Sequence, residues 1–179
     1  MRRRAFTLIE LLVVVSIIGL LMGLLAWLGA DWATKFQYGV MGLLIAALVS
    51  FFAGGIPRWD AAVLMQNWGQ PEAGPGFWVL FAIFFPAVTG IMAGANMSGD
   101  LKNPRRAIPL GTMSAIFVTM VIYIAIAYMM TKISSAAELR NNQLIIADKA
   151  LWEPAVIAGI MGATLSSALG SMLGAPRIL

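Results

Sequence analysis

The sequence predicts an all-α membrane protein with four to five transmembrane helices. Hydrophobic residues make up 60% of the chain and charged residues only 11%, whereas a soluble domain carries about 25% charged residues. The mean hydropathy is +0.87. The apolar residues also fall in long runs, which is the pattern of a chain dissolved in lipid. Helices are expected because lipid offers no partner to an unpaired backbone group.

The expected spans follow one another along the chain. Each is long enough to cross a hydrocarbon core of about 30 Å at about 1.5 Å per helical residue. The basic start MRRR precedes the first of them. The five apolar runs cover residues 6–28, 36–54, 77–98, 107–131 and 153–175.

The polar gaps indicate how these spans are connected. Residues 55–76 contain three prolines and several glycines, so we expect an irregular loop with a short interfacial turn. Residues 99–106 (GDLKNPRR) form a tight connector whose basic residues favour the cytoplasmic side. Residues 132–152 are the most polar stretch, and we expect a short amphipathic helix there.

Composition excludes several function classes. The chain has no Cys and no His, which removes thiol chemistry, the usual general base and the commonest metal ligand. We therefore expect no enzyme, no cofactor and no metal beyond alkali ions. The net charge of +4 comes from Lys and Arg in the gaps between apolar runs. That placement favours the lipid bilayer, and not nucleic acid, as the partner.

The run 77–98 carries a proline in its middle. Pro86 has no N–H and its ring clashes with the carbonyl of Ala82, so the helix should break there. A break exposes carbonyls that can hold a cation and amides that can hold an anion. The alternative is a proline-kinked helix in which Gly90 and Gly94 form a close-packing face.

The last run combines small residues with hydroxyls. Gly162, Ser166, Gly170 and Gly174 recur every four residues and form a smooth ridge for a neighbouring helix. From the residues alone, Ser166 and Ser167 are expected to hydrogen-bond their own helix or that neighbour.

The first residues resemble the cleavage and methylation segment of type IV prepilins. A basic leader is followed by Ala5, Phe6 and the string FTLIELL, with Glu10 inside the apolar run. This resemblance implies cleavage before Phe6, methylation of the new amino terminus, and a role for Glu10 in neutralising a neighbouring subunit's amine. The alternative is an uncleaved signal anchor with one tolerated acid, which needs a partner in lipid.

A second resemblance covers most of the chain. The blocks FAIFFPAVTGIMAGANMSGDLKNPRRAIPLGT (81–112), ATLSSALGSMLGAPRIL (163–179) and, more weakly, residues 29–52 are similar to cation–chloride cotransporters of the amino acid–polyamine–cation superfamily. Their order matches the fifth to eighth helices of that family. Together the two resemblances imply a prepilin-like anchor segment at 1–25 and a partial inverted-repeat transporter domain at 26–179.

The same resemblance implies ion ligands. Pro86 and Thr89 match positions that coordinate potassium. The sodium-coupled members coordinate sodium through positions that match the Ala163 carbonyl and the hydroxyls of Ser166 and Ser167. A chloride site matches the backbone amides of Gly90, Ile91 and Met92.

The function we expect is sodium- and potassium-coupled chloride symport in a bacterial inner membrane, carried by a multi-pass protein of which this chain is a fragment. The family completes its ion sites with helices outside the matched blocks, so the partners expected are those helices or a homodimer. Three alternatives stay open: a fragment of an amino acid permease, a pilin-like or pseudopilin subunit, and a truncated product without function.

Overall fold

Three long apolar helices organise the computed structural model, which describes residues 7–27, 30–69, 76–88 and 98–174. Every regular element in these ranges is helical, and the ranges contain no strand. In chain order the elements are α1 (Leu8–Trp27), α2 (Ala30–Gly55), η1 (Ile56–Arg58), α3 (Ala61–Gly69), α4 (Phe77–Phe84), η2 (Phe85–Val88), η3 (Ser98–Asp100), α6 (Pro104–Ile133), α7 (Ala136–Asn141), α8 (Ile145–Lys149) and α9 (Glu153–Gly174).

The predicted spans at 36–54, 107–131 and 153–175 correspond to α2, α6 and α9. These helices are long and apolar enough to cross a membrane over Trp32–Arg58, Pro104–Ile133 and Glu153–Met172. The first and third predicted runs give shorter apolar helical stretches in the described residues, Leu8–Leu24 and Phe77–Ala87. Whether those two also cross a membrane stays a prediction.

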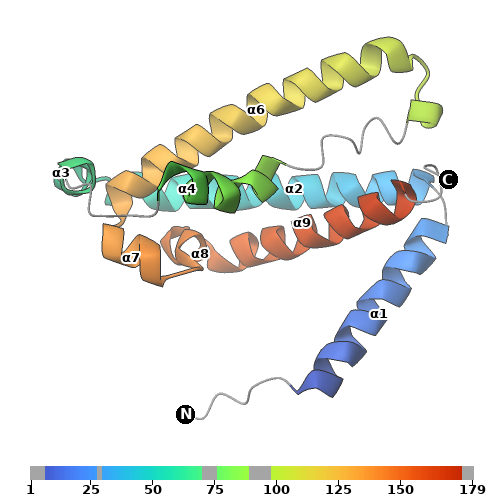
Figure 1. Ribbon diagram of the computed structural model, residues 1–179, viewed down its shortest axis with the longest axis horizontal. Helices are drawn as coiled ribbons and strands as arrows, with labels where there is room; N and C mark the ends of the chain where they lie inside the picture. Colours follow the sequence, from blue (N-terminus) through green and yellow to red (C-terminus); the bar gives the residue numbers. More distant parts are fainter. Residues whose placement is uncertain (1–6, 28–29, 70–75, 89–97, 175–179) are drawn as a thin grey trace.

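The closest helix pair is α2 with α9, which lie side by side in Figure 1. Small residues make this approach possible. A Cβ added at Gly159 would lie 2.9 Å from the Cβ of Ala47, and one added at Gly162 would lie 3.3 Å from Val40 Cγ1. Of the glycine ridge expected on the last helix, Gly162 therefore packs against α2, whereas a Cβ added at Gly170 would meet nothing within 4 Å. Small residues allow close packing of α2 and α9 around Gly159 and Gly162.

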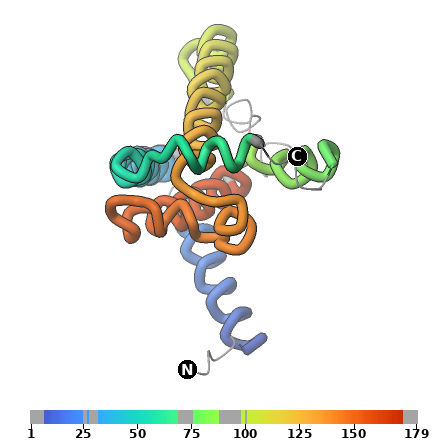
Figure 2. Tube along the Cα trace, turned by 90° about the vertical axis from the view of Figure 1, so that its left-hand side faces the viewer, coloured from blue at the N-terminus to red at the C-terminus, as the bar shows by residue number. Residues whose placement is uncertain are grey.

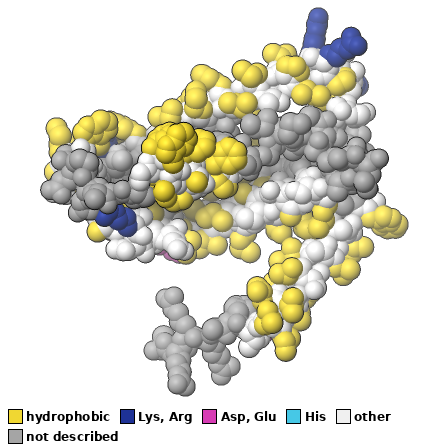
Figure 3. All heavy atoms as spheres, viewed as in Figure 1, with side chains coloured by type: hydrophobic (Ala, Val, Ile, Leu, Met, Phe, Trp, Pro, Cys, Tyr) yellow, Lys and Arg dark blue, Asp and Glu magenta, His cyan; other side chains and the backbone are white. Residues whose placement is uncertain are grey.

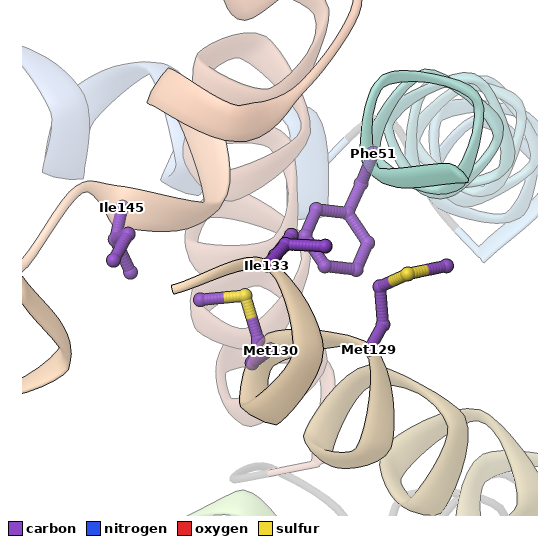
Figure 4. Packing of buried hydrophobic residues seen from close by; sticks show 5 residues of the cluster. All are labelled: Phe51, Met129, Met130, Ile133 and Ile145. Atoms are coloured by element: carbon purple, nitrogen blue, oxygen red, sulfur yellow. The ribbon is translucent and has the colours of Figure 1, made fainter. Parts of the chain in front are cut away.

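The largest cluster of buried side chains lies where α2, α6 and α8 meet. Phe51 of α2 and Ile133 of α6 point toward one another in Figure 4, and Met129 and Met130 lie beside them. Ile145 of α8 completes the cluster. A second cluster joins α1 to α2 and α9 through Met22, Ala33 and Leu169. α1 is otherwise exposed along its length and stands at an angle to the other helices in Figure 1.

Apolar side chains cover much of the outer surface. None of the most apolar stretch of α6 is buried within the chain, and Figure 3 shows hydrophobic side chains along the visible faces of α1, α4 and α6. A soluble monomer rarely exposes a contiguous apolar patch larger than a few hundred Å². This surface is that of a multi-pass membrane protein.

The polar segment between α6 and α9 forms two short helices. Ser135 and Glu138 make a capping box at the start of α7, and Glu138 also pairs with Lys149 of α8 at 3.2 Å. The hydrogen bond from the Ser135 amide lowers the pKa of the Glu138 carboxyl below its ordinary value, and Lys149 adds a smaller effect in the same direction. In place of the single short amphipathic helix that was expected, the segment therefore forms two short helices joined by a turn.

The prediction for residues 55–76 was wrong in one respect, because α3 is a regular helix. Its residues Ala61–Trp68 contain neither proline nor glycine. Pro57 lies at the first turn of η1, where its missing N–H costs nothing. The prolines that favoured an irregular loop therefore lie outside the helical stretch.

Candidate functional site

Regular α-helical bonding in α4 ends just before Pro86, which lies in η2. The Phe85 amide donates to the Phe81 carbonyl as the last α-helical cap of α4, and Phe85–Val88 then form the 3₁₀ helix η2. Pro86 has no N–H, so the Ala82 carbonyl has no donor four residues later. The α-helix therefore ends at the position where a break was predicted, and the course of the chain after Val88 lies outside the described residues.

The expected ligands after this turn lie outside the described residues. These are Thr89 for potassium and Gly90, Ile91 and Met92 for chloride. Their roles, and the alternative packing role of Gly90 and Gly94, stay predictions.

A tyrosine from another helix holds the Pro86 turn. The hydroxyl of Tyr123 on α6 donates to the carbonyl of Ala87 at 3.0 Å. Its ring meets Phe84 edge-on, with centroids 5.6 Å apart and planes at 77°. The contact joins α6 to the residue directly after Pro86.

Sequence reasoning missed Tyr123, although a signal was present. Tyr123 is a tyrosine inside an apolar run, and a phenolic hydroxyl at membrane depth needs an acceptor. A proline-broken helix nearby supplies carbonyls that can serve as that acceptor.

The predicted sodium ligands lie together on α9. Ala163 and Ser166 are half-buried, and Ser167 is exposed. Residues three and four apart on a helix share one face, so the Ala163 carbonyl lies on the same side as both hydroxyls.

The hydroxyls of α9 differ in what they bind. Thr164 donates to the Met161 carbonyl at 2.8 Å, and Ser171 donates to the Ser167 carbonyl at 3.0 Å. Ser166 and Ser167 make no such bond to any residue that the structure describes. Their oxygens are therefore available to a ligand or to a helix outside these ranges.

The acid in the first helix has a local partner. The Glu10 carboxylate accepts from the Thr7 amide at 2.8 Å and from the Thr7 hydroxyl at 2.9 Å. It thereby caps the start of α1. Ala5 and Phe6, where the processing site was predicted, lie outside the described residues.

Comparison with known proteins decides the family. The family model described as "Amino acid permease" matches residues 5–179, which includes α1. The chain belongs to the amino acid permease family. Members of this family are transporters and not enzymes, so the expectation that the chain is not an enzyme is confirmed.

Individual relatives refine this assignment. Solute carrier family 12 member 1 of Mus musculus is 36% identical over 200 residues, which cover 84% of this chain and 18% of the relative. Solute carrier family 12 member 2 of Danio rerio is 32% identical over 202 residues, with the same two coverages. Solute carrier family 12 member 8 of Homo sapiens is 34% identical over 161 residues, 84% of this chain and 22% of the relative.

The resemblance to cation–chloride cotransporters is therefore confirmed at the level of the family. This permease is related to the solute carrier family 12 cation–chloride cotransporters. The chain spans about a fifth of the length of these relatives.

Proposed function

We propose that this permease chain contributes the fifth to eighth helices of a sodium- and potassium-coupled chloride symporter. The observation that carries the proposal is the loss of α-helical bonding at Pro86 inside an apolar segment. Irregular backbone at membrane depth is tolerated where it lines a cavity, and broken helices hold ions in many transporters.

The proposed cation and anion sites use opposite ends of the break. The Pro86 carbonyl and the Thr89 hydroxyl hold potassium, because oxygen ligands without full charge bind an exchangeable ion weakly. The amides of Gly90, Ile91 and Met92 hold chloride, because backbone N–H groups left without an intrahelical acceptor bind anions. The Tyr123 hydroxyl fixes the peptide next to these groups through its bond to Ala87.

Sodium coupling is supported by the free hydroxyls of α9. Ser166 and Ser167 keep their oxygens unbound within the described residues, whereas Thr164 and Ser171 bond their own helix. Together with the Ala163 carbonyl, they offer three oxygens on one face. A further helix completes the coordination shell.

The proposed arrangement is multi-pass, with α1 and the run of residues 77–98, which begins with α4 and η2, as additional spans of a partial inverted-repeat fold. The connector at 99–106 faces the cytoplasm of a bacterial cell, because Lys102, Arg105 and Arg106 crowd into it. The exposed apolar face of α6 then meets lipid or further helices of the transporter.

A second candidate is transport of an amino acid or another organic substrate. It is favoured by the description of the matching family model, which names amino acid permeases. An organic substrate needs a larger cavity than an ion, and the same Pro86 break would then bind its carboxylate.

Processing at Phe6 is a separate proposal. The prepilin-like string is followed by apolar helices, so cleavage and methylation would be incidental to transport. Mass spectrometry of the amino terminus reports both modifications. Recovery of the mature chain in pili would favour the structural role instead.

Uptake distinguishes the two substrate classes. Residues 26–179 replace the matching stretch of a cation–chloride cotransporter, and the chimera is reconstituted in liposomes. Saturable rubidium uptake that needs both chloride and sodium supports the proposal. Uptake of labelled amino acids that is independent of chloride would contradict it.

A further inference from the structure

The short helix α3 lies across one end of the structure. Figure 1 shows α3 along its own axis, whereas α2 runs across the view; Figure 2, turned by 90°, shows α3 along its length. α3 therefore runs across the direction of α2. α3 lies at the end where α2 and α6 finish.

Polar contacts fasten α3 to the last turn of α6. The Asp60 amide donates to the Lys132 carbonyl at 3.2 Å. The Asn67 side chain donates to the carbonyls of Thr131 and Ser134 at 2.8 and 2.9 Å. These acceptors belong to the end of a helix, where carbonyls have no intrahelical donor. The inward face of α3 is thus fixed.

The fixed face determines what the other sides of α3 present. Val63, Leu64 and Asn67 are half-buried against the structure. Met65 and Trp68 are 74% and 80% exposed, and their spacing of three residues places them on one flank. The exposed polar side chain of Gln66 lies on another flank.

The depth of α3 follows from the length of α2. The apolar helical stretch Trp32–Arg58 has 27 residues, which span about 40 Å at 1.5 Å per residue. A bilayer has a hydrocarbon core of about 30 Å and a thickness of about 40–45 Å with its headgroups. The end of this stretch at Arg58, in η1, therefore reaches the headgroup layer, and α3 starts three residues later.

Other tryptophans lie at the same end. Trp59 and Trp152 are 48% and 63% exposed, and tryptophan is enriched where membrane meets water. Lys132 is only 8% exposed. Its ammonium lies 4.0 Å from the Trp59 ring centroid and 4.5 Å from that of Tyr128. This cation is shielded by aromatic rings beneath α3.

We propose that α3 is an interfacial helix that lies in the plane of the membrane surface and binds lipid. Met65 and Trp68 insert among the headgroups and the first methylenes of the acyl chains, and Gln66 faces water. The partner is the bilayer interface itself. This inference is independent of which solute the permease carries.

Spin labels test the proposal in the cysteine-free chain reconstituted in liposomes. Labels are placed singly by Met65→Cys, Gln66→Cys and, as a deep reference in the middle of α2, Ile45→Cys. We expect the Met65 label to be more accessible to oxygen and less accessible to a water-soluble nickel chelate than the Gln66 label. The Ile45 label should favour oxygen most strongly.

Two outcomes would overturn the proposal. Equal nickel accessibility at positions 65 and 66 would place α3 in water, and protection of position 65 from both reagents would place it under protein. A second measurement avoids the labels. Lipids brominated near the headgroup should quench tryptophan fluorescence more strongly in the wild-type chain than in Trp68→Phe, and an equal quench in the two chains would contradict insertion.

Discussion

The Ser50 hydroxyl on α2 holds both backbone groups of Trp152, the residue before α9. It accepts from the Trp152 amide at 2.8 Å and donates to the Trp152 carbonyl at 3.1 Å. The Ser50 carbonyl also accepts from the Leu151 amide at 2.9 Å. Since Ser50 is only 7% exposed, this junction fixes where α9 starts on α2 and hence where its serine face lies.

Removing the Ser50 hydroxyl should destabilise the α2–α9 pair. Ser50→Ala leaves a poorly hydrated amide and a carbonyl without their partner, which costs about 1–3 kcal/mol. Thermal unfolding in detergent measures the loss. Ser114→Ala, at an exposed serine that bonds only its own helix, should change stability by less than about 0.5 kcal/mol. Equal unfolding temperatures for the two variants would show that the junction does not contribute to stability.

A methyl group at Gly54 should displace the segment before α9. A Cβ there would overlap backbone atoms of Lys149, Ala150 and Leu151, and such overpacking costs about 1–3 kcal/mol or more. Gly39→Ala in the same helix is the control, because a Cβ there meets nothing within 4 Å. That change should be neutral or stabilising by about 0.5–1 kcal/mol. Similar unfolding temperatures for the two variants would contradict the close approach.

Loss of the Tyr123 hydroxyl should weaken ion binding at the Pro86 turn. Tyr123→Phe keeps the ring contact with Phe84 and removes the bond to the Ala87 carbonyl, a change of about 0.5–1.5 kcal/mol. We expect the half-saturating rubidium concentration of the chimera to rise about two- to tenfold, with less effect on maximal rate. Tyr128→Phe is the matched control. A lower maximal rate with unchanged half-saturation would assign Tyr123 a structural role only.

Accessibility in intact cells should reveal the orientation. Asn103 lies in the basic connector and Ala137 in α7, and both are exposed. Because positive loops favour the cytoplasm, a membrane-impermeant maleimide should label Ala137→Cys in intact cells but Asn103→Cys only after lysis. Labelling of Asn103→Cys in intact cells would place the connector outside the cell and would reverse the orientation inferred for every later loop.

The sequence was sufficient to predict the elements with strong local signals. Long apolar runs predicted α2, α6 and α9, because length and hydropathy alone identify a span. Pro86 predicted a break in its helix, and α4 does end at Phe84 beside it, because a missing N–H acts within its own turn. That the backbone there continues as the 3₁₀ turn η2 was not predicted. The glycine ridge predicted the close packing found at Gly162, but not that α2 would be the partner or that Gly170 would lack a close neighbour.

Contacts between distant segments could not be predicted in this way. The bonds of Ser50 to Trp152 and of Tyr123 to Ala87 join residues far apart in the chain, and no local pattern marks which pair will meet. α3 was missed because the prolines around it outweighed its short helical stretch. The predicted chloride ligands lie outside the described residues, so they stay predictions.

Sodium dependence of uptake tests the central claim most directly. In the chimera that carries residues 26–179, Ser166→Ala combined with Ser167→Ala removes two hydroxyls that donate to no residue in the described ranges. A hydrogen bond to a charged group is worth about 1.5–3 kcal/mol, and we expect a loss of that order for each sodium contact. Thr164→Val combined with Ser171→Ala is the control, because those hydroxyls bond their own helix. We predict that the first pair raises the half-saturating sodium concentration for rubidium uptake at least about tenfold, while the control pair leaves it unchanged. Unchanged sodium dependence in the Ser166 and Ser167 variant, with normal expression, would contradict the proposed sodium site.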